Sequence, residues 1–525
     1  MPKVLISDSL SPAAVQIFKD RGIDVDVVVG LTPDQLKAII GAYDGLAIRS
    51  STKVTADLLA AAQTLKVVGR AGIGVDNVDI PAATARGVVV MNTPYGNSIT
   101  TAEHAIAMMF AVARDIPQAN TSTHAGKWEK SRFMGVELTA KTLGIIGCGN
   151  IGAIVAERAI GLKMKVVAYD PFLSVERSKT LGVEKVELDD LLARADFITL
   201  HTPLTEATRN IIRADTLAKT KRGVRIINCA RGGLVVEEDL KAALDSGQVA
   251  GAALDVLQEE PARQNILFGH DKVICTPHLG ASTTEAQENV ALQVAEQISD
   301  FLLTGAVTNA INMPSVSAED APKLKPYMAL AGQVGSFAGQ LTDQALRSVT
   351  VAYEGQVAGL NTRPLTATLL EGLFKPFVET VNLVSAPVIA RARNITVTET
   401  KNETSSNYHT LIRLSVTTES MTRSIEGTLF DGDKPRIVAI KDIAIEAELG
   451  PYMLYVTNVD KPGFIGRLGT ALGEAGVNIA TFHLGRSAAG GDAIALIQVD
   501  QPVGAELLAK VRAIPNVVQA KALQF

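Results

Sequence analysis

Three residues that lie far apart in the chain could together perform acid–base chemistry on a small anion: Arg231, Glu260 and His278. Histidine can accept a hydroxyl proton while hydride leaves the same carbon, and a neighbouring carboxylate can orient the ring and raise its pKa. Arginine can clamp a carboxylate through two parallel hydrogen bonds. Taken singly, each residue is more often structural, because a histidine after proline and a Glu-Pro pair are common in loops. Taken together, they fit the oxidation of a 2-hydroxy acid.

A glycine-rich segment offers a place for the hydride acceptor. The apolar run LGII leads into Gly147, Gly149 and Gly152, and a helical pattern follows. The first glycine allows a tight turn, the second lets a pyrophosphate approach the backbone, and the third lets helix and strand pack closely. The next apolar run ends on Asp170, whose carboxylate can bind ribose hydroxyls and repel a 2′-phosphate. This order of features predicts a βαβ unit that binds NAD rather than NADP.

Polar residues follow the predicted strands of residues 1–95, where strand and helix patterns alternate. Arg49, Arg70 and Asn92 each close one of these strands. In an open parallel sheet, ligands bind beyond the carboxyl ends of the strands, so two arginines at equivalent strand ends suit a small anion. The alternative is that both are ordinary surface arginines, which is the commoner fate of a single arginine. A long helical pattern over 283–303 can carry the chain back to this first unit.

The order of elements predicts an α/β protein built from four units. Two doubly wound, parallel-sheet domains of the Rossmann or flavodoxin-like kind come first. The first of them, which would hold the substrate, spans 1–96 and 285–312, and the second, which would hold NAD, spans 97–284. An α+β domain follows over 317–448, after a proline-containing linker. Residues 451–525 follow the order β-α-β-β-α-β, which is ferredoxin-like.

The bulk composition argues against several classes of partner. The chain has 525 residues, 47% of them hydrophobic, and a formal charge of −5, so it has no basic tail or patch for nucleic acid or a membrane surface. No run reaches the ~20 apolar residues that span a bilayer, and the N-terminal residues lack the basic flank of a signal peptide. Three widely spaced cysteines argue against a disulfide framework and a metal cluster. We therefore expect a cytoplasmic protein without a metal site.

The glycine turn GCGNIG, the segments NCARGG and PHLGAST and the Glu-Pro pair together resemble the D-isomer-specific 2-hydroxyacid dehydrogenase family over residues 1–312. The resemblance implies NAD as cofactor and Arg231, Glu260 and His278 as catalytic residues. Within the family, IRSSTKVT, VGRAGIGVDNVD and MNTPYGNSITTAEH resemble the branch that oxidises 3-phosphoglycerate to 3-phosphooxypyruvate, the first step of serine synthesis. The long form of that branch adds an intervening domain and an ACT domain, and it implies a homo-oligomer, either a dimer or a tetramer.

The resemblance also implies which residues contact the ligands. The expected cofactor contacts are Gly147, Gly149, Asn150, Ile151, Gly152, Asp170, Thr202, Cys229, Ala230, Asp255, Gly280 and Ala281. Among these, Asp170 would meet the adenosine ribose and Asp255 the nicotinamide carboxamide. The expected substrate contacts are Arg49, Ser50, Arg70, Asn97 and Arg132. Ile73 departs from the family, because relatives often have threonine there, so the chain offers no side-chain hydroxyl to the cofactor at this position.

The last domain resembles an ACT amino-acid sensor through NVDKPG (458–463) and VNI (477–479). Such domains bind a small amino acid where two copies meet, which implies Asn458, Asp460 and Asn478 as regulatory contacts. L-serine is the expected effector, because the resemblance places it at the end of the pathway. The alternative is a module that only mediates dimerisation, since the βαββαβ topology serves many functions.

Two other functions share these features. A glyoxylate or hydroxypyruvate reductase would use the same three catalytic residues, but the added C-terminal domains and Asp170 argue against it. An NAD(H)-sensing binding protein of the same fold, like the C-terminal-binding-protein corepressors, would need no turnover. The sequence has no disordered tail of the kind expected for that class. Formation of NADH from 3-phosphoglycerate separates the three hypotheses.

Overall fold

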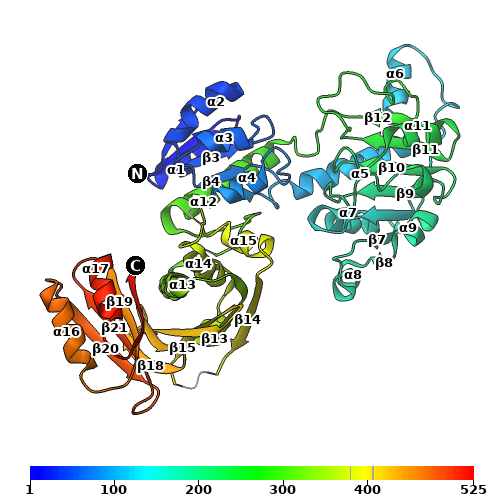
Figure 1. Cartoon of the computed structure of the whole chain (residues 1–525). Coiled ribbons are helices and arrows are strands. Elements are labelled where there is room, and N and C mark those ends of the chain that lie inside the picture. Colours follow the sequence, from blue (N-terminus) through cyan, green and yellow to red (C-terminus); the bar gives the residue numbers. More distant parts are fainter. Residues whose placement is uncertain (318, 379, 405–406) are drawn as a thin grey trace.

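The computed structural model describes residues 1–317, 319–378, 380–404 and 407–525, and these residues form four sheets along the chain (Figure 1). Two parallel sheets come first, and a mixed sheet and an antiparallel sheet follow. The predicted α/β class, with α+β and ferredoxin-like parts toward the C-terminus, is confirmed. In Figure 1 the N-terminal elements (blue) lie between the second sheet (cyan to green) and the C-terminal half (yellow to red).

The first sheet is parallel throughout, with the strand order β2-β1-β3-β4-β5. Helices cover both of its faces, so its inner strands are continuous apolar runs such as GLAI. The elements are β1 (Lys3–Ile6), α1 (Pro12–Asp20), β2 (Asp24–Val27), α2 (Pro33–Ile39), the 3₁₀ turn η1 (Ile40–Ala42), β3 (Gly45–Ile48), α3 (Ala56–Ala61), β4 (Val67–Arg70), α4 (Ile80–Ala85) and β5 (Val89–Asn92).

A helix from beyond the second domain completes the core of this first sheet. The helix α12 (Thr284–Thr304) packs on α1 and β4, and Figure 1 shows it in green beside the blue elements. Gly69 permits this approach, since a Cβ there would lie 2.6 Å from Ile298 Cδ1 and from Val294 Cγ2. Because α12 supplies buried side chains to the same core as β1 and β4, the first sheet depends on a segment that is remote in sequence.

The second sheet has seven parallel strands in the order β12-β11-β10-β9-β6-β7-β8. The strand order reverses between β6 and β9, and ligands bind in the crevice at such a point. The elements are α5 (Ser98–Arg114), α6 (Ile116–His124), β6 (Thr142–Ile146), α7 (Asn150–Gly161), β7 (Lys165–Tyr169), α8 (Val175–Leu181), β8 (Glu184–Lys185), α9 (Leu188–Arg194), β9 (Phe197–Leu200), α10 (Ala214–Leu217), β10 (Val224–Asn228), α11 (Glu237–Asp245), β11 (Val249–Leu254) and β12 (Val273–Cys275).

The third sheet is mixed, with the order β14-β13-β15-β16-β17-β18, and two long helices pack against it. These helices approach closely because Gly335, Gly339 and Gly372 lie where they cross, and a Cβ on any of the three would overlap the other backbone. The elements are α13 (Ala321–Leu341), β13 (Leu346–Gly355), the 3₁₀ turn η2 (Gln356–Gly359), α14 (Arg363–Phe374), α15 (Ala386–Ala392), β14 (Thr396–Asn402), β15 (Thr410–Thr418), β16 (Thr422–Phe430), β17 (Lys434–Ile440) and β18 (Ile443–Ala447).

The fourth sheet is antiparallel, with the order β20-β21-β19-β22, and its two faces are covered differently. The helices α16 and α17 pack on one face. The other face packs on the third domain, where the Tyr455 and Phe337 rings meet edge to face at 5.9 Å. The elements are β19 (Tyr452–Val459), α16 (Phe464–Glu474), β20 (Ile479–Arg486), β21 (Asp492–Val499), α17 (Ala505–Arg512) and β22 (Val517–Gln524).

Candidate active site

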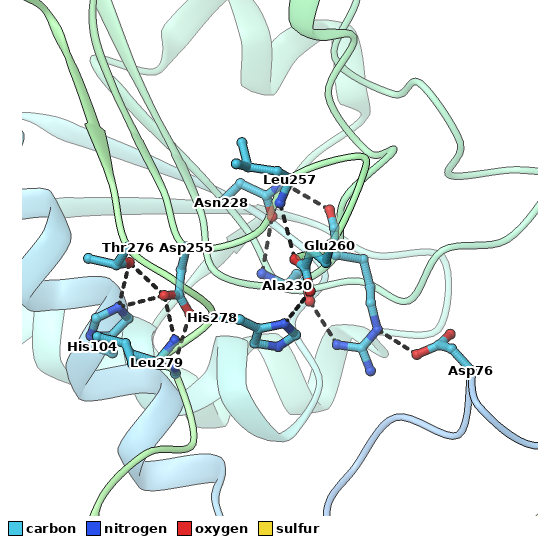
Figure 2. Close-up of polar contacts among 12 residues, drawn as sticks. Asp76, His104, Asn228, Ala230, Asp255, Leu257, Glu260, Thr276, His278 and Leu279 are labelled. Atoms are coloured by element: carbon cyan, nitrogen blue, oxygen red, sulfur yellow. Dashed lines mark hydrogen bonds and ion pairs between the residues drawn. The ribbon is translucent and has the colours of Figure 1, made fainter. Parts of the chain in front are cut away.

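The histidine and the glutamate that were predicted to act together are in contact. His278 Nδ1 lies 2.7 Å from Glu260 Oε2, and Glu260 Oε1 accepts a hydrogen bond from the Leu257 N–H (Figure 2). The hydrogen bond to Glu260 raises the pKa of His278, against the opposite effect of burial. Burial acts to raise the pKa of Glu260, but its hydrogen bond with His278 helps to bring that pKa below the usual value. The pair therefore favours a protonated histidine beside an ionised glutamate.

Asp255 holds much of the backbone around His278, together with the Thr276 carbonyl, which also accepts from the His278 N–H (3.0 Å). His278 has a φ of 55°, in the left-handed region that non-glycine residues rarely adopt. The His278 N–H donates to the Asp255 carbonyl (2.9 Å), and the N–H groups of Leu279 and Gly280 donate to its carboxylate at 2.7 and 2.8 Å. Thr276 Oγ1 donates to the same carboxylate (2.6 Å), which is buried after β11. Because both oxygens hold this loop, the contact of Asp255 with a carboxamide stays a prediction.

His104 also belongs to this site, although no sequence pattern distinguishes it. It lies on α5, and its Nε2 is 3.2 Å from Asp255 Oδ1 and 3.3 Å from Thr276 Oγ1 (Figure 2). Burial acts to raise the pKa of Asp255, but the hydrogen bonds from His104 and Thr276 bring it below the usual value. A lone histidine in an apolar helix is most often a packing residue. Only the packing of α5 on β11 brings His104 to Asp255, and no local pattern signals that.

Arg231 follows β10 and reaches across to the first domain. Its Nε donates to Asp76 Oδ2 at 2.9 Å, and its Nη1 donates to the Ala230 carbonyl at 2.7 Å. Asn228 Nδ2 donates to the Arg231 carbonyl (2.9 Å), which fixes the turn after the strand. The charge of Arg231 opposes the protonation of His278, so the two side chains lie in one electrostatic cluster.

Two further arginines stand at strand ends of the first sheet. Burial, together with the nearby charge of Arg231, lowers the pKa of Arg70 to about 10. The Arg70 Nε has no hydrogen-bond partner among the described residues, so part of a buried cation is left for a ligand. Arg49 follows β3, and its Nη1 donates to Gln287 Oε1 of α12 at 2.6 Å. The three arginines form a positive cluster suited to a substrate with more than one anionic group.

The other three residues expected at the substrate lie in different settings. Ser50 is exposed directly after Arg49. Asn97 is buried at the N-cap of α5, and within the described part of the chain its Oδ1 has no partner. Arg132 pairs with Glu129 (3.2 Å) and Asp271 (3.3 Å) in the second domain. Arg132 is therefore engaged away from the arginine cluster, and its contact with substrate stays a prediction.

The glycine turn between β6 and α7 leaves room for a pyrophosphate. Gly147 has a φ of 92°, and a Cβ on it would lie 2.6 Å from the His201 carbonyl oxygen. A Cβ on Gly152 would overlap the Gly147 carbonyl, whereas Gly149 faces open space at the N-cap of α7. The helix then begins at Asn150, so its first N–H groups point at the space beside Gly149. These features fit a dinucleotide.

The remaining cofactor residues lie along the same edge of the second sheet. Asp170 follows β7, and its carboxylate accepts hydrogen bonds from the Cys148 and Phe172 N–H groups, both at 2.8 Å. These bonds hold the carboxylate beside the glycine turn, where a ribose would lie. Other expected residues follow β9, β10 and β12 and include Thr202, Cys229, Ala230, Gly280 and Ala281. Because the strands are parallel, all of these residues follow strand ends at one edge of the sheet.

The three residues expected to bind an effector are engaged with neighbours in their own domain. Asp460 Oδ2 accepts from Arg486 Nη1 (2.8 Å) and from the Gly490 N–H (3.2 Å). Asn478 Nδ2 donates to the Asp500 carboxylate at 2.8 Å. Asn458 is buried, and its Nδ2 donates to the Val459 carbonyl at 3.0 Å, whereas its Oδ1 has no hydrogen-bond partner among the described residues. No hydrogen bond joins Asn458, Asp460 and Asn478 to one another among the residues that the structure describes.

The described residues contain neither a membrane-spanning helix nor a metal-binding cluster. In the ranges given above, no helix combines the length and apolar character needed to cross a membrane. The same ranges hold no group of three or more His, Cys, Asp or Glu side chains arranged to bind a metal ion. The cysteines are free, and burial raises the pKa of Cys148 and Cys275 to about 11, so neither is a thiolate near neutral pH.

Family models match three segments of the chain. Residues 106–280 match the D-isomer specific 2-hydroxyacid dehydrogenase, NAD binding domain. Residues 323–441 match the D-3-phosphoglycerate dehydrogenase intervening domain, and residues 452–516 match the ACT domain. The first match covers the glycine turn, Asp170 and the three predicted catalytic residues. NAD is therefore the cofactor of the second domain.

Known relatives match the chain over most of its length. The D-3-phosphoglycerate dehydrogenase of Synechocystis sp. is 44% identical over 99% of this chain and 94% of its own length. The D-3-phosphoglycerate dehydrogenase of Bacillus subtilis is 42% identical over 100% of both chains. Among solved structures, a glyoxylate reductase from Paecilomyes thermophila is 29% identical, with a TM-score of 0.55 over 59% of this chain and 98% of that chain. The full-length matches, together with the three domain matches, show that the chain belongs to the D-3-phosphoglycerate dehydrogenase family.

Proposed function

We propose that the chain oxidises 3-phosphoglycerate to 3-phosphooxypyruvate with NAD, the first step of L-serine synthesis. The observation that carries this proposal is the cluster of Arg49, Arg70 and Arg231 near His278. A substrate with a carboxylate and a phosphate has anionic groups for all three arginines, whereas glyoxylate has one carboxylate. The names of the full-length relatives agree with this substrate.

In this mechanism each charged side chain has a separate task. Bound NAD supplies the hydride acceptor. Arg231 would hold the substrate carboxylate through the guanidinium N–H groups that Asp76 and the Ala230 carbonyl leave free, and Arg49 and Arg70 would hold the phosphate. His278 would take the hydroxyl proton on Nε2, because its Nδ1 faces Glu260, and the ionised Glu260 would stabilise the imidazolium that forms.

The raised pKa of His278 sets the expected pH dependence. Oxidation needs neutral histidine as the base, so kcat/KM in this direction rises as the pH passes upward through that pKa. The reverse reaction needs the protonated histidine as an acid, so its kcat/KM falls over the same range. An assay of 3-phosphoglycerate oxidation therefore belongs at alkaline pH.

The assay compares three substrates with one protein preparation. We expect NADH to form from 3-phosphoglycerate, and NADH to be consumed only weakly with glyoxylate or hydroxypyruvate, which lack a phosphate. Arg49→Gln is the matched variant, because it would weaken use of 3-phosphoglycerate and leave glyoxylate unaffected. Efficient reduction of glyoxylate without oxidation of 3-phosphoglycerate would instead support a reductase. Binding of NADH without turnover of any substrate would support an NAD(H)-sensing protein.

We also propose an organisation and a regulation for this enzyme. The proposed domains are residues 1–96 with 285–312 for substrate, 97–284 for NAD, 317–448 as intervening domain and 451–525 as ACT domain. The enzyme would be a cytoplasmic homotetramer that L-serine inhibits through Asn458, Asp460 and Asn478. The ACT match supports an amino-acid effector, and calorimetry with L-serine and sedimentation of the full chain are the direct tests.

A further inference from the structure

Residues 309–311, on the way from α12 to the intervening domain, extend the first sheet through one isolated antiparallel β-bridge, and we call this segment the added strand. Ile311 N–H donates to the Val90 carbonyl (2.8 Å), and Asn92 N–H donates to the Asn309 carbonyl (3.2 Å). The pairing is antiparallel, as the bridge between Met91 and Ala310 shows. β5 is the last strand of the five-stranded sheet, so this segment covers an edge that would otherwise present unpaired backbone groups.

The side chain of Asn312 fastens this added strand. The Val90 N–H donates to Asn312 Oδ1 at 2.9 Å. Asn312 Nδ2 donates to the Val88 carbonyl (2.9 Å) and to Thr84 Oγ1 (3.1 Å). One amide group thus ties the added strand to both β5 and α4. The sequence alone marked this region only as the start of a linker.

The end of β5 holds the loop over residues 72–76. Asn92 Nδ2 donates to the Ile73 carbonyl at 2.7 Å. Gly72 N–H donates to Thr93 Oγ1 (2.6 Å), and Thr93 N–H donates back to the Gly72 carbonyl (3.0 Å). The loop is therefore fixed at its start by two consecutive residues, and one of them is also bonded to the added strand.

The other end of this loop reaches the catalytic cluster. Asp76 accepts from Arg231 Nε at 2.9 Å, and a Cβ on Gly74 would overlap the Arg231 guanidinium. The loop backbone thus lies directly against the arginine that would hold the substrate carboxylate. A continuous set of hydrogen bonds runs from Asn312 through β5 and Asn92 to the loop, where the Asp76 ion pair and the packing of Gly74 meet Arg231.

We propose that Asn312 is a positioning residue of the active site, which acts through β5 and Asn92 to hold the 72–76 loop against Arg231. The segment next to the intervening domain would then help to shape the substrate site without touching the substrate. Only the kinetic part of the test below rests on the proposed function, because the mobility of the loop can be measured without substrate.

The first test uses hydrogen exchange in the full-length chain. Asn312→Ala is expected to speed amide exchange in residues 70–77 by roughly three- to thirtyfold, a size typical of coupling between connected sites. The matched control is Asn361→Ala, because Asn361 Nδ2 donates to the Ser315 carbonyl (2.8 Å) in the same linker but away from β5. The control is expected to keep wild-type exchange at the loop. Equal exchange at 70–77 in wild type and Asn312→Ala would overturn the proposal.

The second test separates positioning from general destabilisation. In Asn312→Ala the KM for 3-phosphoglycerate is expected to rise by roughly the same factor, with the dissociation constant of NADH unchanged. Combination with Asn92→Ala is expected to add little, because both changes break the same set of bonds. If the KM changes of Asn312→Ala and Asn92→Ala add fully in the double variant, Asn312 has a merely structural role. The same holds if Asn312→Ala weakens the binding of NADH and of substrate equally. If wild type does not oxidise 3-phosphoglycerate, the proposed function fails while the exchange experiment still decides this inference.

A more conservative variant, Asn312→Asp, keeps the proposal testable if Asn312→Ala does not fold. Asn312→Asp keeps an acceptor for the Val90 N–H but loses both bonds that the amide donates. It is expected to show an intermediate increase in exchange at 70–77. Wild-type exchange in this variant would count against the proposal, because two of the three bonds would then be irrelevant to the loop.

Discussion

Two regions gather charged groups near strand ends but balance those charges differently. One is the candidate active site with Arg49, Arg70, Arg231 and His278, here called the cleft. The other is the set of expected effector residues Asn458, Asp460 and Asn478, here called the ACT turn. In the cleft, Arg70 is half-buried, and its buried Nε lacks a partner among the described residues. In the ACT turn, Asp460 pairs with Arg486 and Asn478 bonds to Asp500. A site with surplus charge is ready for a ligand of opposite charge, whereas a self-paired site must first break a contact. We therefore expect strong, local effects from substitutions in the cleft and weaker ones in the ACT turn.

The largest effect should come from Arg231→Lys, which tests the surplus charge of the cleft. The ammonium keeps the charge but cannot form two parallel bonds to a carboxylate. We expect kcat/KM for 3-phosphoglycerate to fall by about 10²- to 10³-fold, as when a positioned donor is removed from an active site. Steady-state kinetics with wild type as reference gives the measurement. A change of only a few-fold would show that charge alone is sufficient at this position.

A smaller loss, with a shift in pH, is expected for Glu260→Gln. Glu260 raises the pKa of His278, so its neutral replacement should lower that pKa. Because oxidation needs neutral histidine, the rise of kcat/KM with pH should move to lower pH. The plateau should fall by roughly 10²-fold, since the imidazolium loses its partner. A pH profile that keeps its midpoint would contradict the role of Glu260.

The cleft could be predicted from sequence because its residues stand at ends of predicted strands. Arg231 and Asp170 each follow an apolar run, and parallel strands place such ends along one edge. The φ of His278 and the bond from His104 to Asp255 depend instead on how the loop after β12 and the helix α5 pack. This packing joins segments that are distant in sequence, so no local periodicity in the sequence predicts it.

The later domains show the same limit. The order of strands and helices in the ACT domain followed from alternating apolar patterns, as did its ferredoxin-like topology. Its packing on the intervening domain, with Tyr455 against Phe337, did not. The pairing of Asp460 with Arg486 did not follow from sequence either, because Asp460 lies in the turn after β19 whereas Arg486 ends β20. Local pattern thus predicted the elements, whereas tertiary packing decided the partners of their side chains.

A third substitution, Asp170→Ala, tests the cofactor end of the cleft. Asp170 is held by the Cys148 and Phe172 N–H groups, so its carboxylate is fixed before NAD binds. Loss of its hydrogen bonds to the ribose should weaken the affinity for NAD by about tenfold, and loss of its charge should relax discrimination against NADP. The ratio of kcat/KM for the two cofactors measures the effect. An unchanged ratio would mean that another group reads the ribose.

The smallest effects are expected in the ACT turn. They test whether the ion pair between Asp460 and Arg486 weakens the binding of L-serine. If L-serine binds through Asp460, its amino group must take the place of Arg486, whose bond to Asp460 helps to lower the carboxyl pKa. Binding can slow turnover only if it favours a less active arrangement of the domains, and such coupling is commonly about fivefold or more. Asp460→Ala should abolish serine inhibition and leave the uninhibited kcat nearly unchanged, because the residue lies in a separate domain.

Arg486→Ala separates self-pairing from simple binding in that turn. Removing the arginine frees Asp460, so inhibition should need a lower serine concentration, by roughly two- to fivefold, the size of an exposed ion pair. Arg467→Ala is the matched control, because Arg467 lies near the same turn but, among the described residues, donates only to the Pro462 carbonyl. Initial rates measured at increasing L-serine concentration give the inhibition of Asp460→Ala, Arg486→Ala and Arg467→Ala. If Arg486→Ala instead weakens inhibition, the arginine is part of the effector site rather than a competitor for it, and the two regions would then hold their ligands in the same way.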